Sequence, residues 1–507
     1  MNFSEFAQFL SKLEKISSRI EITKVLSELF GKLEEKETAQ AVYLLLGGLA
    51  PKYKIIVFNV ADKMMIRAVS QAYKKSSEEV IDIYRKSGDL GDVVEHLSKS
   101  KKSKGNNISI IQVHKSLADI AQDSGEKSQE RKVEKSVKLL NSLDPVSAKF
   151  VVRIMLGKLR LGFSDSTMLD AISWMIAGDK THKKQLEKTY FVLPDVGILL
   201  SEVKKNGIEK ATKDIKPIVG VPVLPLLAAR IKTPEEMLEK MGGVVAVEPK
   251  LDGLRLSLHI DKAKGIVKAF TRNLNENSWM FPELGELGKY INAESVILDT
   301  EAVGLTEETK KMANFQATMT RRRKHNIGNV SKKTKITFFV FDILSINGKS
   351  LMNEPFSKRR SILEKTIVKS PLIKTVEYSE TKDPKAILKL HKKYSSEGYE
   401  GIMVKKLDSS YVPGRTGWRW VKMKQTSTHI AKVADTVDCL VMGYSVGKGK
   451  RAEFGMGRFL VGISDGDKIK TTTKIGTGLT DAQFREMKKR LTKLEVKTKP
   501  KQYELHK

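Results

Sequence analysis

Residues 248–255 read EPKLDGLR and lie in a run, residues 244–260, in which apolar and polar residues alternate. Alternation with a period of two predicts a half-buried strand that sends Glu248, Lys250 and Asp252 to one side, converging on one pocket. A lysine ammonium is not a nucleophile, but burial or a nearby positive charge lowers its pKa and makes the amine reactive. The segment therefore predicts a reactive lysine in a pocket.

Two neighbours of Lys250 bear on this prediction. Arg255 is a source of nearby positive charge and can also hold a phosphate, and Gly253 lets the backbone turn close to a ligand. The alternative interpretation is an ordinary hairpin turn at Asp252 and Gly253 with solvated surface charges. Because a short Lys-x-Asp-Gly string is common by chance, these residues alone leave both interpretations open.

Four later segments run apolar strands into charged residues, although a buried strand with solvated ends explains any one of them. Two ammonium groups on one strand face, with no acidic residue nearby in the sequence, suit a triphosphate. The segments are SVILDTEAV at 295–303 with Asp299 and Glu301, FFVFDIL at 338–344 with Phe341 and Asp342, EGYEGIMVK at 397–405 with Glu400 and Lys405, and RWVKMK at 419–424 with Lys422 and Lys424 opposite core-facing Val421 and Met423.

Positive charge is spread along the whole chain. The 91 Lys and Arg against 60 Asp and Glu give a net charge of +31. The excess is +8 over residues 1–215, +15 over 216–425 and +8 over 426–507. A basic excess in every block favours a polyanion lying along the protein, either nucleic acid or an anionic membrane, although a lysine-rich proteome is an alternative. The longest apolar stretch, residues 41–50, is too short to span a bilayer, which favours nucleic acid.

The single cysteine, Cys439, excludes a disulfide framework and a multi-cysteine zinc site. Residues 1–20 carry charges at helical spacing and have no apolar signal-peptide core. Both features predict a cytoplasmic protein.

The length of 507 residues and the changes of pattern predict about three domains. Residues 1–215 carry apolar residues at three-to-four spacing and predict an all-helical block. This pattern runs through residues 26–46, 80–97 and 146–176, and Gly162 is expected to end one helical stretch as a C-cap.

The other two blocks contain strand-like runs. Residues 216–425 alternate strands with helical stretches and predict an α+β domain. Residues 426–507 predict a short barrel or sandwich, followed by a helix over 481–494 with Thr480 as its N-cap.

Together these segments resemble the covalent nucleotidyltransferase superfamily, and most closely the ATP-dependent DNA ligases of archaeal and eukaryotic replicative type. The resemblance covers nearly all of the chain. It implies a helical DNA-binding domain over residues 1–215, an adenylation domain over 216–425 and a C-terminal OB-fold β-barrel over 426–507. The strings that carry it, in order, are YLLLGGLAP at 43–51, EPKLDGLR, FTRN at 270–273, ILDTEAV at 297–303, NFQATMTRRRK at 314–324, FFVFDIL, EGYEGIMVK, WVKMK at 420–424, GKGKRAEFG at 447–455 and TKIGTGL at 473–479.

The resemblance also implies a mechanism with ATP and Mg²⁺ as cofactors. In the family the motif lysine, here Lys250, attacks the α-phosphate of ATP and becomes lysyl-AMP. The AMP then passes to the 5′-phosphate of a DNA nick, and the 3′-hydroxyl displaces it to seal the strand. Such transfer depends on positioning and on charge neutralisation. The implied roles are Glu248 at the adenine edge, Phe341 stacked on the base, Glu301 on the ribose hydroxyl and on metal, Arg255 and Arg272 on phosphate and sugar, Glu400 on metal, and Lys422 on the α-phosphate with Lys424 close by.

The chain departs from the family pattern in two places. Many members have Gly-Lys-Arg before the last lysine motif, whereas residues 414–416 read Gly-Arg-Thr, so Arg415 is a weaker assignment for the nucleotide-binding arginine. Family chains also continue past the equivalent of residues 499–506 into further barrel strands and a last basic motif. We therefore expect an incomplete barrel, and either a fragment or an impaired first step. One cysteine argues against the zinc module of NAD-dependent ligases, which favours ATP.

Two other classes of function stay open. An RNA ligase or a capping guanylyltransferase uses the same lysine chemistry, although the large helical block argues against both. A non-catalytic basic DNA-binding protein would bind DNA without nucleotide. The expected partners are nicked duplex DNA and, by resemblance, a sliding clamp. We expect a monomer with no membrane partner, associated with the nucleoid in the cytoplasm and acting in replication, repair and recombination.

Overall fold

The computed structural model describes residues 1–99, 107–159, 161–306, 334–414, 417–424, 438–446 and 455–505. The chain divides into two compact units, Met1–His429 and Ile430–Lys507, which are described separately. The boundaries predicted at residues 215 and 425 stay predictions.

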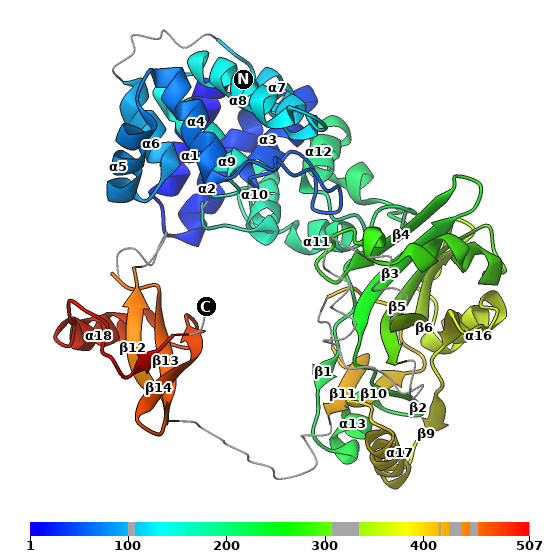
Figure 1. Cartoon of the computed structure of the whole chain (residues 1–507). Helices are drawn as coiled ribbons and strands as arrows, with labels where there is room; N and C mark the ends of the chain where they lie inside the picture. Colours follow the sequence, from blue (N-terminus) through cyan, green and yellow to red (C-terminus); the bar gives the residue numbers. More distant parts are fainter. Residues whose placement is uncertain are drawn as a thin grey trace. The chain divides into compact units, whose positions relative to one another are not determined.

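The first part of the first unit is built of helices (Figure 1). Their apolar faces share one core that includes Phe6, Leu29, Phe150 and Leu200, all fully buried. The predicted all-helical block is confirmed. The helices are α1 Phe3–Glu14, α2 Arg19–Lys32, α3 Glu35–Leu45, α4 Asp62–Tyr73, α5 Ser77–Ser87, α6 Leu90–Ser98, α7 Ile110–Gln122, α8 Ser128–Asn141, α9 Pro145–Met155, α10 Asp165–Ala177, α11 Lys183–Val192 and α12 Val196–Thr212.

Each of the three long helical patterns spans two helices. Gly88, in the left-handed conformation at φ 71°, ends α5, and the side chain of Asp89 then caps α6. Gly162 is not a C-cap, because α9 ends at Met155 and Gly162 lies in the connection to α10. Apolar spacing alone did not reveal the breaks between α2 and α3 and between α5 and α6, because only two residues separate the helices of each pair.

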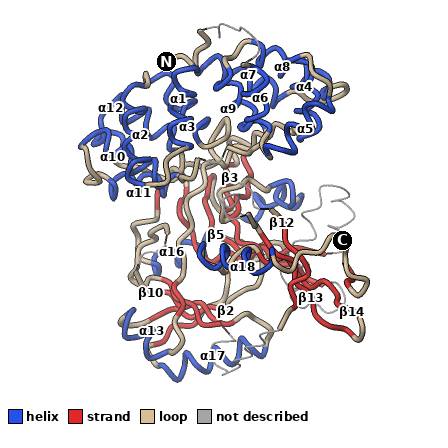
Figure 2. The backbone as a smooth tube through the Cα atoms, turned by 90° about the vertical axis from the view of Figure 1, so that its left-hand side faces the viewer, coloured by secondary structure: helices blue, strands red, loops and turns tan. Residues whose placement is uncertain are grey.

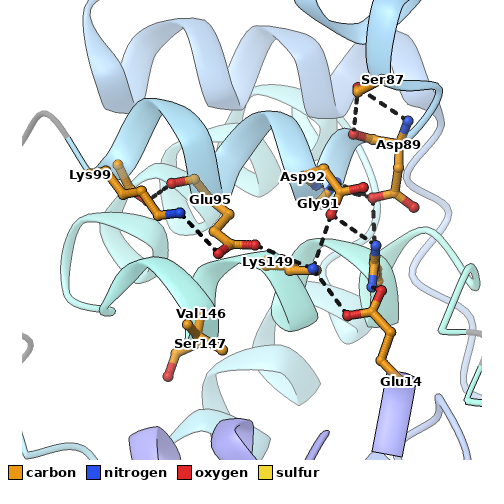
Figure 3. A network of polar contacts seen from close by, with 12 residues as sticks. Glu14, Ser87, Asp89, Gly91, Asp92, Glu95, Lys99, Val146, Ser147 and Lys149 are labelled. Atoms are coloured by element: carbon orange, nitrogen blue, oxygen red, sulfur yellow. Dashed lines mark hydrogen bonds and ion pairs between the residues drawn. The ribbon is translucent and has the colours of Figure 1, made fainter. Parts of the chain in front are cut away.

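A polar network joins α1, α6 and α9 (Figure 3). Lys149 Nζ lies 3.1 Å from Glu14 and 3.0 Å from Asp92, and Arg153, one turn further along α9, lies 2.6 Å from Glu14. A Cβ atom on Gly91 would stand 2.8 Å from the Lys149 carbonyl oxygen, so only glycine permits this approach of α6 to α9. The network therefore aligns three helices that are distant in sequence.

The remainder of the first unit contains two sheets and is the predicted α+β part (Figures 1 and 2). One sheet has the strand order β4-β3-β5-β6-β7, with β8 paired to β6, and the other has the order β1-β11-β10-β2-β9. Helices α13 and α17 pack on one face of the second sheet through Met237, Ile387 and Val404. The bounds are β1 Ala229–Arg230, α13 Pro234–Met241, β2 Val245–Pro249, β3 Leu254–Asp261, β4 Ile266–Thr271, η1 Ser278–Met280, η2 Pro282–Tyr290, β5 Ser295–Thr306, β6 Thr334–Ile346, β7 Lys349–Ser350, α16 Phe356–Thr366, β8 Ile373–Thr375, β9 Ser379–Thr381, α17 Pro384–Ser396, β10 Gly401–Lys406 and β11 Trp420–Lys424.

The strand expected over residues 244–260 is in fact two strands, β2 and β3, in different sheets. The hairpin interpretation is therefore wrong, since the intervening residues cross from one sheet to the other. The expectation that Asp252 shares a side with Glu248 is also wrong, because β2 ends at Pro249 and Asp252 is exposed. A Cβ atom on Gly253 would stand 2.5 Å from the Ala302 carbonyl oxygen, so glycine is needed where the crossing segment meets β5.

The second unit is a four-stranded sheet with one helix against it. The strand order is β12-β13-β14-β15, and Met456, Phe459, Val461 and Phe484 form its small core. Thr480 caps the helix as predicted, with a capping box. The sheet agrees with the C-terminal architecture expected of the family; residues 447–454 and 314–324, to which two of the sequence strings belong, lie outside the described residues. The elements are β12 Leu440–Ser445, β13 Arg458–Asp465, β14 Lys468–Ile475, α18 Asp481–Thr492 and β15 Tyr503–Glu504.

Candidate active site

A cavity of about 230 Å³ is lined by residues of both sheets in the first unit. It brings together eight of the residues that the sequence singled out. These are Glu248 and Lys250 at the end of β2, Arg255 in β3, Arg272 just after β4, Glu301 in β5, Phe341 in β6, Lys405 in β10 and Lys422 in β11. The crossing between β2 and β3 places Lys250 where the two sheets meet.

Lys250 is held against Glu400, the residue that precedes β10. Its ammonium group forms an ion pair with one carboxylate oxygen of Glu400, and the other oxygen pairs with Lys424. The side chain of Lys250 is 19% exposed, so it is reachable from the cavity. Glu400 is thus an acidic partner of Lys424 that was not apparent from the neighbouring sequence.

Positive charge is concentrated beside this ion pair. Burial lowers the pKa of Lys422, and the charges of Lys250, Lys424 and Arg272 lower it further, against the opposing effect of Glu400. These cations suit a polyphosphate better than a single carboxylate. Arg415, the remaining predicted cation, lies outside the described residues.

Arg255 has a different set of contacts from the one expected. Its Nε and Nη2 donate to the Asp299 carboxylate at 2.9 and 2.6 Å, and its Nη1 donates to the Leu226 carbonyl oxygen at 2.8 Å. The hydroxyl of Tyr411 donates to the same carboxylate at 2.8 Å. Each guanidinium nitrogen therefore already donates to a protein oxygen, and the prediction that Arg255 contacts phosphate remains a prediction.

Glu301 is a half-buried carboxyl in the cavity wall. Burial raises its pKa to about 7, although Arg255 and Lys250 favour the ionised form. The pKa of Glu400 is lowered, because hydrogen bonds from Lys250 and Lys424 outweigh the opposing effect of burial. The two carboxyls therefore differ in how readily they carry a negative charge.

Lys405 is a site residue whose partner the sequence did not reveal. Only 1% of its side chain is exposed, and its Nζ lies 2.7 and 2.9 Å from the two carboxylate oxygens of Glu248. It also donates to the Phe341 carbonyl oxygen at 2.9 Å and lies 4.5 Å from the ring centre of Trp420. The alternation along β10 was a signal for this position. Lys405 lies on the same face of the strand as Met403, which also lines the cavity, whereas Val404 between them faces the core.

The carboxylates fit a Mg²⁺ ion that retains waters and substrate phosphates. Among the described residues no group of three or more acidic, histidine or cysteine side chains could hold a metal. Mg²⁺ is commonly bound through one or two carboxylates together with substrate phosphate oxygens, so Glu301 and Glu400 have the chemistry that such an ion would require.

Comparison with known proteins identifies the family of the chain. Residues 225–424 match the family "ATP dependent DNA ligase domain", residues 2–173 match "DNA ligase N terminus" and residues 452–507 match "ATP dependent DNA ligase C terminal region". The chain is 37% identical over 503 residues to a protein named "Probable DNA ligase" from Dictyoglomus thermophilum, which covers 99% of this chain and 85% of the relative. The chain belongs to the ATP-dependent DNA ligases.

A second relative also matches this ligase over nearly its whole length. The "DNA ligase" of Aeropyrum pernix is 34% identical over 513 residues, covering 97% of this chain and 84% of the relative. Among solved structures, "Pmar-Lig_PreS3" has a TM-score of 0.54 at 18% identity, covering 96% of this chain and 91% of that one, which supports the fold. The resemblance stated from the sequence is confirmed, and the enzyme uses ATP and acts on DNA. Within the described part of the ligase, no helix has the length and apolar character needed to cross a membrane.

Proposed function

We propose that this ligase seals nicks in duplex DNA through a lysyl-AMP intermediate on Lys250. The observation that carries the proposal is the position of the Lys250 amine, at the rim of a nucleotide-sized cavity and beside Glu400, Lys422 and Lys424. A covalent nucleotidyl intermediate requires a nucleophile within reach of phosphorus and cations that neutralise the phosphates.

In the first step the neutral Lys250 amine attacks the α-phosphorus of ATP. A nitrogen–phosphorus bond forms, the bond to the bridging oxygen breaks, and pyrophosphate leaves. Lys422, Lys424 and Arg272 neutralise the phosphates, and Mg²⁺ bound through Glu301 and Glu400 would supply further charge neutralisation. The AMP then passes to the 5′-phosphate of the nick, and the 3′-hydroxyl displaces it as the phosphodiester bond forms.

The base end of the cavity has the residues for an adenine. Phe341 offers a ring for stacking, and Glu248 and Lys405 provide an acceptor and a donor at the deep end. Glu301 is proposed for the ribose hydroxyl, since its carboxyl lies on the opposite sheet from Glu248.

We further propose the wider organisation that the sequence suggested. Residues 1–215 form the DNA-binding domain, 216–425 the adenylation domain and 426–507 the OB-fold domain, each contributing basic residues to one duplex. A role in DNA replication, repair and recombination, a sliding clamp as a partner, action as a monomer and association with the nucleoid belong to the same proposal.

Incubation with α-labelled ATP and Mg²⁺ tests the chemistry. We expect the label on the wild type and its loss in Lys250→Ala, while Lys406→Ala, a change at a half-buried lysine of β10, keeps it. Each protein is then given a nick that already carries AMP on its 5′-phosphate, which separates the sealing step from self-adenylation. A label that survives Lys250→Ala refutes the lysine assignment, and failure to seal the pre-adenylated nick refutes nick sealing.

A further inference from the structure

Arg360, in α16, is a buried arginine close to the base end of the cavity. Its side chain is 3% exposed, its Nε donates to Glu364 at 2.7 Å, and its Nη2 donates to the Val376 carbonyl oxygen at 2.5 Å. Its guanidinium lies 4.5 Å from the ring centre of Tyr378. These contacts fix the plane of the guanidinium from three directions.

The third nitrogen of Arg360 is the unusual one. Nη1 is buried and has no hydrogen-bond partner among the described residues. It lies 4.0 Å from a carboxylate oxygen of Glu248, which Lys405 contacts as well. A buried donor without a partner is costly, so its placement beside Glu248 calls for a role.

Glu248 lies between these two cations and is itself 2% exposed. Burial raises the pKa of its carboxyl, and the charges of Lys405 and Arg360 oppose that rise. An ionised carboxylate accepts hydrogen bonds and donates none, whereas a protonated one can do either. The two cations therefore favour the form of Glu248 that only accepts.

We propose that Arg360 is a positioning residue that sets the base selectivity of the nucleotide pocket through Glu248. This rests on the proposed function, in which the base end of the cavity holds the purine of ATP. An acceptor-only carboxylate matches the 6-amino group of adenine and repels the 6-carbonyl oxygen of guanine. Arg360 contributes charge and orientation to Glu248 and does not itself touch the base.

The test compares ATP with nucleotides that differ from it at the 6-position of the purine, of which GTP also carries a 2-amino group. Equilibrium dissociation constants of the full chain are measured by calorimetry for ATP, for purine riboside triphosphate, which lacks the 6-amino group, and for GTP. For the wild type we expect loss of the amino group to weaken binding roughly 10- to 100-fold, as for a hydrogen bond to a charged group. In Arg360→Met we expect loss of the amino group to weaken binding only about threefold or less. The preference for ATP over GTP should fall as well.

Two variants accompany Arg360→Met. Arg360→Lys keeps the charge and is expected to restore most of the discrimination, which a purely structural role of the guanidinium would not predict. Lys358→Met, an exposed change on the same helix, is expected to bind like the wild type. Thermal unfolding of each variant reports whether it is folded. The ratio of the dissociation constants of two nucleotides for one variant does not depend on how much of that variant is folded, because only the folded molecules bind.

The result is independent of covalent chemistry at Lys250, because binding can also be measured in Lys250→Ala. Full discrimination in Arg360→Met overturns the inference about Arg360. Equal binding of ATP and purine riboside triphosphate by the wild type overturns base recognition by Glu248, whether or not Lys250 is labelled.

Discussion

Gly401, at the start of β10, lies so close to Met423 in β11 that a Cβ atom on it would overlap the Met423 carbonyl oxygen. Its φ is +137°, a conformation that L side chains rarely adopt. The Gly401 carbonyl accepts a hydrogen bond from Lys250 N–H at 2.9 Å, and Glu400 N–H donates to the Lys250 carbonyl at 2.9 Å. Gly401 therefore allows the backbone to hold Lys250 beside the carboxylate of Glu400.

The variant Gly401→Ala should separate β10 from β11. We expect its free energy of unfolding to fall by about 2–3 kcal/mol, because the added methyl group would overlap backbone atoms of β11, which cannot move aside without displacing the strand. Urea unfolding followed by tryptophan fluorescence measures the change. Gly288→Ala is the control, since nothing lies within 4 Å of its Cβ position, and a change within about 0.5 kcal/mol is expected there. Equal stability of the two variants would refute the packing argument.

The variant Glu400→Gln removes the charge that pairs with Lys250 and Lys424. We expect the single-turnover rate of protein labelling by ATP to fall about 100-fold, since in the proposed mechanism this carboxylate and the Mg²⁺ that it would hold supply several kcal/mol of charge stabilisation at the phosphates. The Mg²⁺ concentration for half-maximal rate should rise as well. Glu397→Gln, an exposed carboxylate in the same segment, should leave both unchanged. An unaltered Mg²⁺ dependence in Glu400→Gln would argue against metal binding by Glu400.

The variant Asp299→Asn leaves Arg255 and Tyr411 without their charged acceptor. Removing one partner of a buried ion pair leaves an uncompensated charge, so we expect the free energy of unfolding to fall by about 3 kcal/mol. Asp408→Asn is the matched control because the Asp408 side chain is 75% exposed and only 3.8 Å from its lysine. If Asp299→Asn and Asp408→Asn unfold at the same urea concentration, the network is not a stabilising one.

His259 should make the stability of the protein depend on pH in mildly acidic solution. Its Nδ1 accepts from Gly220 N–H at 3.1 Å, so its Nε2 carries the proton and donates to Ser257 Oγ at 2.9 Å. Burial lowers its pKa to about 3. Below the ordinary value near 6.5 the unfolded chain binds a proton that the folded chain does not, so the free energy of unfolding falls as pH drops from about 6.5 towards 3, by at most about 1.4 kcal/mol per unit.

Replacement of His259 by glutamine removes this titration. As pH falls through that window, the wild type should therefore lose more free energy of unfolding than the variant does. Chemical unfolding at pH 7.0, 6.0 and 5.0 measures it. Parallel pH dependences for the two proteins would show that His259 does not contribute.

Local patterns in the sequence predicted much of the second sheet. Val421 and Met423 are fully buried and Lys422 and Lys424 are not, as the alternation in RWVKMK indicated. The alternation failed at EPKLDGLR, because β2 is buried along its whole length and ends before Asp252. A period-two pattern describes a strand with one solvated face, and β2 lies between helices on one side and the cavity on the other.

The sequence by itself determined the family, the helical and mixed blocks and the charged residues that we propose for the site, because strings, periods and caps are local properties of the chain. The tertiary structure alone decided which charge meets which. Lys250 pairs with Glu400, 150 residues away, and Lys405 pairs with Glu248, 157 residues away, because the strand order places β10 between β2 and β11. Sheet order depends on the packing of whole strands and helices, so no local pattern near either residue contains it.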